Sequence, residues 1–355
     1  MSFDDLRKRI DFIDAEIVRL IGERVTIAQE IGEEKRVEGR RVNDQAREDE
    51  VLSHIRHIAG GENLNPEIIE NIYRQIITAC RRTQGAEVAF QGEIGAYGEE
   101  AALRFFGPLM STRPCESLEE VFKVVEQDKA QYGIIPVENS LEGSISRSYD
   151  LMLDSSLKVS GETELRIVHC LIANPGTRLD LIRRVYSHPQ ALGQCKAFLK
   201  HLGCELIPTS DTAGSVKMIK EKGLSDGAAV ASARAAEIYE MNILTREIED
   251  NPHNFTRFFI LSREDYPPSG NDKTSIVFAV KHKPSALYDF LKEFADQKLN
   301  LSKIESRPTR RKPWEYNFYL YFDGHRDDKT AREVLSRLEE KSLFMKILGS
   351  YPKAR

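Results

Sequence analysis

The sequence predicts a multidomain protein of α and α/β segments. We expect an all-helical segment over residues 1–85, a two-lobed α/β segment over 86–266, and a ferredoxin-like βαββαβ segment over 272–355. The first segment has apolar residues at helical spacing, and the second alternates short apolar runs with helical stretches. The third alternates strand and helix patterns in the order βαββαβ. A chain of 355 residues is long enough for two or three domains.

The composition favours a globular chain with small-molecule partners. No apolar run reaches the roughly 20 residues needed to span a bilayer, and the polar, acidic N-terminus does not resemble a signal peptide. We therefore expect a cytoplasmic protein with no membrane partner. The net charge of −5 argues against nucleic acid, while small anionic substrates remain open. The five cysteines are odd in number and include no C-x-x-C pair, so we expect reduced thiols, no metal and no cofactor.

A long amphipathic helix is expected to open the chain. Its apolar residues recur at alternating steps of four and three: Leu6, Ile10, Ile13, Ile17, Leu20, Ile27 and Ile31. About 30 residues at about 1.5 Å each give roughly 45 Å of helix. Because a module this small could not cover such a helix alone, we expect a dimer of interlocked helices.

One position of this apolar seam is charged. Arg24 stands where an apolar residue is due, and such a charge is costly unless it meets an opposite charge. Lys35 points in nearly the same direction around the helix, whereas Arg7 lies about 100° away and could serve a site across a dimer. A solvated basic face is the alternative interpretation.

Two further helices are expected to add polar residues to the same cavity. After a break near Gly39, three residues share one face through their spacing: Asp44, Arg47 and Glu48. A helix that begins after Pro66 ends with Cys80 and Gln84 one turn apart. The set contains several cations, two carboxylates and an amide, but no nucleophile and no metal-ligand set.

In order and spacing, these residues resemble the all-helical chorismate mutase family over essentially the whole segment. The resemblance implies the rearrangement of chorismate to prephenate, a pericyclic reaction that needs a preorganised site rather than an acid, a base or a covalent intermediate. It implies that Lys35 and Gln84 face the ether oxygen as catalytic residues. It also implies substrate-binding residues: Arg7 of the partner subunit, Arg24, Asp44, Arg47, Glu48 and Cys80.

The second segment is expected to begin with a strand, a glycine-bearing loop and a helix. The strand Val88–Phe90 leads into the loop Gln91–Glu99 and a helix from Glu99 to Phe106. A helix N-terminus after a glycine turn can bind an anion, although this is also an ordinary βα connection. The loop lacks the dinucleotide fingerprint, so no nucleotide cofactor is expected.

Polar residues follow two more predicted elements of this segment. The buried strand that begins at Tyr132 runs into Asn139 and Ser140, at the end of a strand where open α/β sheets bind ligands. A second lobe is expected from about residue 165 to 234, with a strand over 166–173 and turns that open two helices. These turns carry Ser187, His188, Gln190 and Thr212, and a lone His before Pro is alternatively a capping residue.

The two lobes are expected to be joined by a returning strand and to enclose a cleft. We expect Ala228–Ala231 to return to the first lobe, so that two crossings form a hinged cleft similar to that of periplasmic binding proteins. The stretch Asn254–Phe259 carries Thr256 and Arg257 at the mouth of a buried strand, as a candidate proton donor and a candidate carboxylate clamp. An ordinary strand Thr and a solvated Arg are the alternatives.

Four stretches resemble the prephenate dehydratase family in its order: residues 91–99, 136–144, 187–190 and 254–258. The resemblance implies loss of water and carbon dioxide from prephenate to give phenylpyruvate, with Thr256 as the proton donor. A Thr hydroxyl is a weak acid, so its neighbours must polarise it. The implied substrate-binding residues are Asn139, Ser140, Ser187, His188, Gln190, Thr212, Arg257 and Phe258.

The last segment resembles the ACT regulatory domains of phenylalanine biosynthesis. Two stretches carry the resemblance: Ser285, Ala286 and Leu287, and then Glu305, Ser306, Arg307 and Pro308. The resemblance implies that phenylalanine binds there at a dimer interface and shifts the cleft toward a closed state. Ser285 stands where the family usually has Gly, and simple oligomerisation is the alternative role.

Together the three segments resemble the bifunctional chorismate mutase/prephenate dehydratase family, with at least a dimeric assembly expected. Three alternatives stay open. The middle segment could be an amino-acid sensor beside an active mutase, or a dehydratase that also accepts arogenate. The other domains could also serve only to assemble the mutase.

Overall fold

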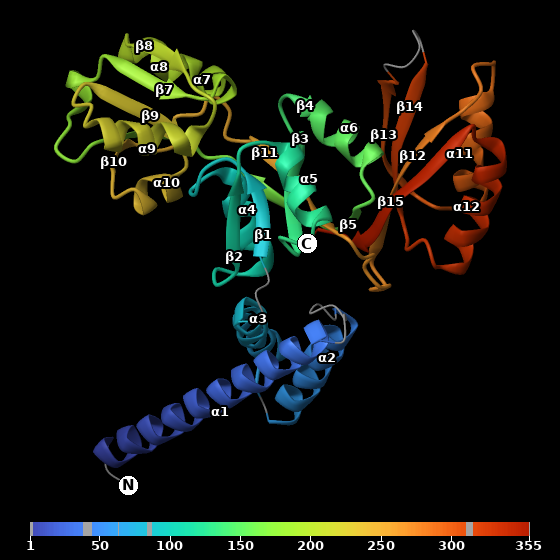
Figure 1. Ribbon diagram of the computed structural model, residues 1–355, viewed down its shortest axis with the longest axis horizontal. Helices are drawn as coiled ribbons and strands as arrows, with labels where there is room; N and C mark the ends of the chain where they lie inside the picture. Colours follow the sequence, from blue (N-terminus) through green and yellow to red (C-terminus); the bar gives the residue numbers. More distant parts are fainter. Residues whose placement is uncertain (1–2, 38–44, 63, 84–86, 310–314, 355) are drawn as a thin grey trace. The chain divides into compact units, whose positions relative to one another are not determined.

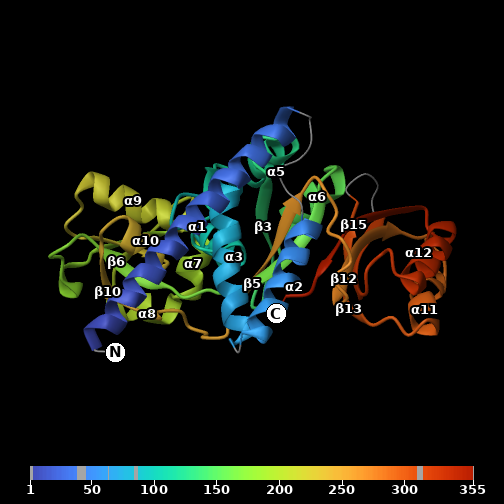
Figure 2. The same ribbon diagram turned by 90° about the horizontal axis from the view of Figure 1, so that it is seen from below.

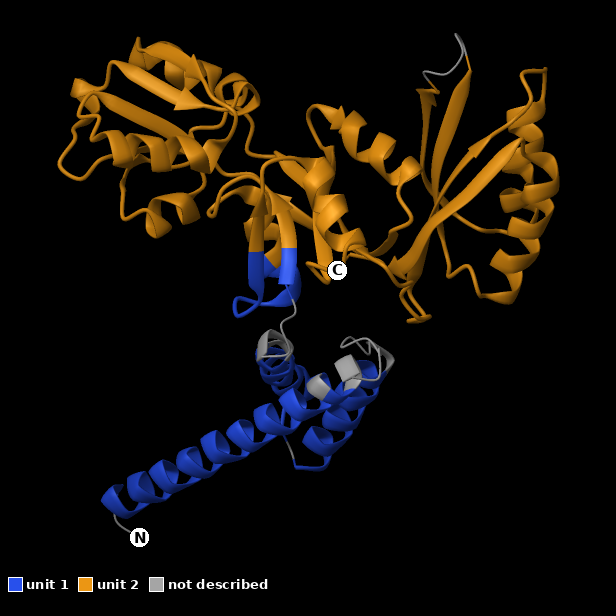
Figure 3. Ribbon diagram, viewed as in Figure 1, with its two compact units in different colours: residues 1–88, 103–112 blue, residues 89–102, 113–355 orange. Residues whose placement is uncertain are grey.

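The computed structural model describes residues 3–37, 45–62, 64–83, 87–309 and 315–354, and these form two compact units (Figure 3). One unit comprises residues 1–88 and 103–112, and the other comprises residues 89–102 and 113–355. Within the described ranges, no helix combines the length and the apolar composition that spanning a bilayer requires. The domain boundaries expected from the sequence remain predictions.

The first unit contains the helices expected from the sequence: α1 (Phe3–Val37), α2 (Gln45–Gly61) and α3 (Pro66–Thr83). Buried Glu70 joins two of them, because it pairs with Arg56 of α2 and, at 2.6 Å, with Arg74 of α3. In Figure 1 the N-terminal part of α1 projects beyond α2 and α3. The apolar seam from Leu6 to Ile31 is accordingly 44–57% exposed, and the interlocked dimer that would cover it stays a prediction.

The first lobe, most of which belongs to the second unit, is built on a sheet of order β2-β1-β3-β11-β5, with β4 paired to β3. Its strands are β1 (Glu87–Gln91), β2 (Ser111–Cys115), β3 (Tyr132–Asn139), β4 (Gly143–Ser144), β5 (Lys158–Arg166) and β11 (Phe255–Ser262). The accompanying helices are α4 (Tyr97–Phe106), α5 (Leu118–Glu126) and α6 (Ser146–Asp154). Strand β11, next to the β5 edge, is antiparallel to both of its neighbours, β3 and β5.

The second lobe has its own sheet, of order β10-β6-β9-β7-β8. Its strands are β6 (Cys170–Ala173), β7 (Arg184–Ser187), β8 (Glu205–Pro208), β9 (Gly227–Ala231) and β10 (Asn242–Thr245). Its helices are η1 (Leu179–Leu181), α7 (Pro189–Gln194), α8 (Lys196–Leu202), α9 (Thr212–Lys222) and α10 (Ala233–Ile238). The chain crosses between the lobes twice, after β5 and after β10.

Two expectations for these crossings were wrong. The strand expected over 166–173 is divided, because β5 ends in one sheet and β6 begins in the other. The backbone between them bonds to the other crossing instead, from Ile167 N–H to Asn254 O and from His169 N–H to the Glu249 carboxylate. The strand over 228–231 is β9, which stays between β6 and β7 with every residue buried. The strand that returns is β11.

The C-terminal part has the expected βαββαβ order, with an antiparallel sheet β13-β14-β12-β15. Its elements are β12 (Asp272–Ala279), α11 (Ala286–Asp296), β13 (Leu301–Pro308), β14 (Tyr316–Asp323), α12 (Lys329–Lys341) and β15 (Phe344–Pro352). Both helices lie on one face of this sheet (Figures 1 and 2). The other face packs on the first lobe, where Tyr319, Tyr321 and Tyr351 share a core with Phe259 and Tyr149.

This docking allows no side chain at Gly349 of β15. A Cβ there would lie 2.1 Å from Val159 O of β5, much closer than real Cβ atoms approach. We expect Gly349→Ala to destabilise the docked C-terminal part by about 1–3 kcal/mol, as overpacking does. Hydrogen exchange of the β5 and β15 amides in the full chain should accelerate.

The matched control is Gly193→Ala in α7, where no heavy atom lies within 4 Å of the added Cβ. This variant should be neutral or slightly stabilising, since Ala costs less conformational entropy than Gly in a helix. Unchanged exchange of β5 and β15 in Gly349→Ala would contradict the close approach.

Candidate active sites

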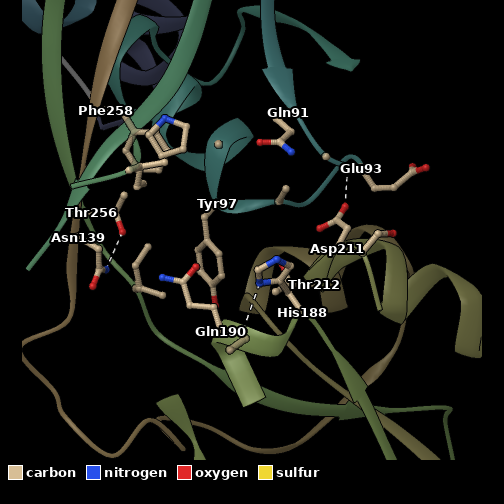
Figure 4. Close-up of a pocket in the computed structure, with 18 of the residues that line it drawn as sticks. Gln91, Glu93, Tyr97, Asn139, His188, Gln190, Asp211, Thr212, Thr256 and Phe258 are labelled. Carbon is tan, nitrogen blue, oxygen red and sulfur yellow. Dashed lines mark hydrogen bonds between the residues drawn. The ribbon is translucent and has the colours of Figure 1, made fainter. Parts of the chain in front are cut away.

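A cavity of about 670 Å³ lies between the two lobes of the second unit (Figure 4). The polar residues that line it from the first lobe include Gln91, Glu93, Tyr97, Glu116, Asn139 and Thr256. From the second lobe come His188, Gln190, Gln194, Asp211 and Thr212, and His169 lines it from a crossing segment. The described residues contain no group of His, Cys, Asp and Glu side chains that could hold a metal ion.

Thr256 and Phe258 both line this cavity from β11. Successive side chains of a strand point to opposite faces, so the residue between them points away. Arg257 is therefore absent from the cavity wall, and its guanidinium bonds Glu164 at 2.7 and 3.0 Å and Glu138 at 3.0 Å. Arg257 is thus not placed to contact a substrate carboxylate in this cavity.

Asn139 orients the hydroxyl of Thr256. The Asn139 Oδ1 accepts the backbone N–H groups of Leu141, at 3.0 Å, and Glu142, at 3.1 Å, so its Nδ2 must be the donor on the other side. This Nδ2 lies 3.0 Å from Thr256 Oγ1 (Figure 4). Because the Thr256 oxygen accepts this bond, its own hydrogen can be donated to a molecule in the cavity. An N–H donor also stabilises negative charge on that oxygen, which makes the hydroxyl a stronger acid.

The opposite wall is built from two helix N-termini. His188 caps α7, because its Nδ1 accepts the Gln190 N–H at 3.3 Å. Its side chain also lines the cavity, so His188 is a capping residue and a cavity residue at once. Thr212 is the first residue of α9, whose N-cap Asp211 accepts the N–H groups of Ala213 and, from the first lobe, Glu93. Figure 4 shows these side chains facing Thr256 and Phe258 across the cavity.

Two further predicted residues lie outside the cavity wall. Ser187 is fully buried, and its hydroxyl donates to Val230 O at 2.6 Å, where it ties β7 to β9. Ser140 bonds the other crossing, donating to His253 O and accepting the Phe255 N–H, both at 2.9 Å. Their expected contacts with substrate are not supported, because both hydroxyls are used to hold the backbone.

Several cavity residues were not among the sequence candidates. Tyr97 and Glu93 lie within the loop that the sequence singled out, so the loop was found but not its side chains. His169 and Gln194 carried no signal, because a lone His before an apolar strand and an amide in a helix are ordinary. His169 is buried, and burial lowers the pKa of its imidazole while the bond to Gln194 opposes the shift.

The first unit brings two mutase candidates together. Arg24 of α1 donates to Cys80 Sγ of α3 at 2.9 Å. The other described candidates lie apart from this pair. Arg47 pairs with Glu50 at 2.9 Å on the exposed side of α2, where Glu48 is half-buried. The Arg7 guanidinium lies 4.2 Å from the centre of the Phe3 ring. Asp44, Gln84 and the side chain of Lys35 lie outside the described residues.

The effector candidates divide into two groups. Ala286 and Leu287 line a second cavity of about 510 Å³, beside Ser285, which has a left-handed φ of 66°. Glu305, Ser306, Arg307 and Pro308 lie on β13 and not in that cavity. Two of them bond the first lobe: Glu305 accepts from Ser144, and Arg307 contacts Ser146 and Asp150 at 2.8 and 3.2 Å.

Two known family models match this chain, one over the helical segment and one over the two-lobed segment. The family model for chorismate mutase type II matches residues 6–85, and that for prephenate dehydratase matches residues 88–266. A bifunctional chorismate mutase/prephenate dehydratase of Aquifex aeolicus is 40% identical over 358 residues, covering 99% of this chain and 98% of that protein.

Two further relatives match about three quarters of the chain. The chloroplastic arogenate dehydratase/prephenate dehydratase 2 of Arabidopsis thaliana is 44% identical over 289 residues. The alignment covers 78% of this chain and 76% of the Arabidopsis protein. The crystal structure of a prephenate dehydratase from Arthrobacter aurescens in complex with L-Phe is 30% identical with a TM-score of 0.69, covering 75% of this chain and 90% of that chain. With both models matched in order and one relative aligned almost from end to end, the chain belongs to the bifunctional chorismate mutase/prephenate dehydratase family.

Proposed function

We propose that this protein rearranges chorismate to prephenate in its helical unit and converts prephenate to phenylpyruvate in the cavity between the lobes. The observation that carries the second step is the orientation of Thr256, whose oxygen accepts the Asn139 amide and whose hydrogen can be donated into the cavity. The cytoplasmic location expected from the sequence is part of this proposal.

The dehydratase chemistry follows from that geometry. As the ring carboxylate leaves as carbon dioxide, the electron pair of its C–C bond enters the ring and the ring hydroxyl departs from the opposite carbon. Thr256 donates the proton that turns this hydroxyl into water, and solvent then returns a proton to Thr256. The Asn139 N–H faces the Thr256 oxygen, on which negative charge develops, so it stabilises the transition state more than the ground state.

A substrate with two carboxylates needs an anion site, and the wall of this cavity supplies one without cationic side chains. Among the described residues that line it, none is Lys or Arg. Helices α4, α7 and α9 all begin at the wall, through Tyr97, Gln190 and Thr212. The first N–H groups of a helix have no partner within that helix and favour anions. His188 already accepts the Gln190 N–H and Asp211 the Ala213 N–H, so we assign the prephenate carboxylates to the remaining N–H groups at the starts of α4 and α9.

Arogenate is a second candidate substrate, because the wall also carries carboxylates at Glu93, Glu116 and Asp211. Arogenate has an ammonium group where prephenate has a keto oxygen, and a carboxylate beside it would stabilise that charge. A relative that is 44% identical bears both arogenate and prephenate dehydratase in its name.

For the mutase step, the geometry of α1 supports a site shared between two chains. Arg7 and Arg24 lie on one straight helix about 26 Å apart, at about 1.5 Å for each residue. They cannot bind the same small molecule within one chain. A second copy packed on the exposed apolar seam could supply Arg7 beside Arg24 and Cys80, so we assign the protein as a homodimer.

Regulation by phenylalanine is proposed from the ACT-like C-terminal part and its ion pairs. Lys303 of β13 pairs with Glu138 at 2.8 Å and Glu305 at 3.3 Å, and Glu138 also pairs with Arg257 at 3.0 Å. Glu138 and Arg257 immediately adjoin Asn139 and Thr256. A shift of β13 on effector binding would therefore move the strands that carry the proton donor.

The test supplies chorismate to the purified protein and follows chorismate, prephenate and phenylpyruvate, with and without phenylalanine. We expect chorismate to disappear, phenylpyruvate to form, and phenylalanine to slow its formation. Accumulation of prephenate would contradict the dehydratase assignment, and stable chorismate would contradict the mutase assignment. Supplying arogenate separately, with phenylalanine as the measured product, decides the second candidate.

A further inference from the structure

A chain of polar side chains, all buried except the half-buried Gln194, connects Thr256 to His169. Asn139 Nδ2 contacts both Thr256 Oγ1, at 3.0 Å, and Asn254 Oδ1, at 2.7 Å. Asn254 Nδ2 donates to Gln194 Oε1 at 2.9 Å, and the same oxygen lies 2.9 Å from His169 Nε2. These residues belong to the first lobe, the second lobe and both crossings, so the chain holds the two walls of the cavity in one arrangement.

The direction of every amide in this chain is determined by its ends. At one end, the backbone N–H groups of Leu141 and Glu142 can only donate, so they fix the Asn139 oxygen. At the other end, Gln194 Nε2 lies 2.9 Å from the Glu142 carboxylate, which can only accept when ionised. Reversing any amide would place two donors or two acceptors face to face. Gln194 must therefore present its oxygen to His169.

This direction assigns the tautomer of His169. Because Gln194 Oε1 is an acceptor, His169 Nε2 has to carry a hydrogen. A neutral ring then has an unprotonated Nδ1. The Tyr97 hydroxyl lies 2.8 Å from this nitrogen and also 2.8 Å from Val168 O, and its single hydrogen is shared between these two acceptors. The ring edge of Tyr97 also packs against the imidazole, with the centroids 5.5 Å apart and the planes at 82°.

We propose that His169 is a positioning residue for the dehydration step: its Nε2–H holds the Gln194 carbonyl and thereby the amide chain that orients Thr256 across the two lobes. The proposal rests on the proposed dehydratase function. His169 donates no proton to substrate in this scheme. Its loss frees Gln194 and Asn254 to turn, and the Thr256 hydroxyl loses its fixed direction.

The kinetic test compares three variants of the full chain. We expect His169→Leu to lower kcat for prephenate by about 10–100-fold, the scale on which misplaced catalytic groups lose rate, with little change in KM. His169→Gln keeps an N–H donor and should recover most of kcat. The control is His325→Leu, because His325 is equally buried at 1% exposure and also bonds a carbonyl oxygen, Tyr266 O, through Nε2.

The proposal is overturned if His169→Gln loses as much kcat as His169→Leu, since bulk and not the donor would then matter. An equal loss in His325→Leu would indicate general destabilisation, and a raised KM with unchanged kcat would make His169 a substrate contact. Rates with chorismate in each variant report whether the rest of the chain is intact.

A spectroscopic arm is independent of turnover. In protein labelled with ¹⁵N-histidine, the His169 signal is identified by its absence in His169→Gln, and we expect the Nε2–H tautomer. A proton on Nδ1 instead would overturn the directed chain. A wild-type protein that forms no phenylpyruvate but shows the Nε2–H tautomer would refute the dehydratase function and leave the directed chain standing.

Discussion

Replacement of Thr256 with valine is expected to lower kcat for prephenate dehydration by about 10²–10⁴-fold, the usual contribution of a positioned acid. Valine keeps the shape and strand preference of threonine but removes the hydroxyl, so the departing ring hydroxyl has no donor. The Asn139 Nδ2 also loses one of its acceptors. Both steps are measured on one preparation, from the disappearance of chorismate and, in a separate assay, of prephenate.

Two variants separate loss of the donor from loss of structure. Thr256→Ser keeps the hydroxyl and should retain much of the rate. Thr163→Val makes the same change on neighbouring β5, at the same 8% exposure but outside the cavity wall, and should leave kcat nearly unchanged. If Thr256→Val keeps kcat within about threefold, Thr256 does not supply the proton.

The sequence was most informative where local pattern decides the structure. The 3.6-residue seam of α1 and the apolar run of β11 each correspond to one regular element, because a periodic apolar face and an unbroken apolar run can both be read directly from the sequence. The same rule could have excluded Arg257. It lies between two residues that face the cavity, and alternation along a strand sends it to the other face.

Contacts between distant parts of the chain could not be predicted from the local sequence pattern. The run Gly227–Ala231 reads as a buried strand, but its composition does not say which sheet it joins. His169 and Gln194 are 25 residues apart, and Asn254 is 60 residues further on. Each is ordinary in its own segment and becomes part of the site only because two crossings bring the lobes together.

The second large effect is expected in the mutase. We expect Arg7→Ala and Arg24→Ala each to lower chorismate turnover by about 10²–10³-fold, the cost of removing one preorganised donor. A mixture of the two inactive variants should recover activity when their subunits exchange. Half of randomly paired dimers would be mixed, and each mixed dimer has one site with both arginines, so about a quarter of wild-type activity should return.

Co-expression of the two variants under separate affinity tags, with purification through both tags, isolates the mixed dimers, which should show about half of wild-type activity because one of their two sites is intact. The control is Arg19→Ala, which removes an exposed arginine of the same helix whose guanidinium pairs only locally, with Glu16 and Glu23, among the ion pairs described. This variant should keep wild-type turnover. A mixture that stays inactive would mean that Arg7 and Arg24 do not meet across two chains. Since about 26 Å of helix separates them within one chain, Arg7 would then have no part in the site.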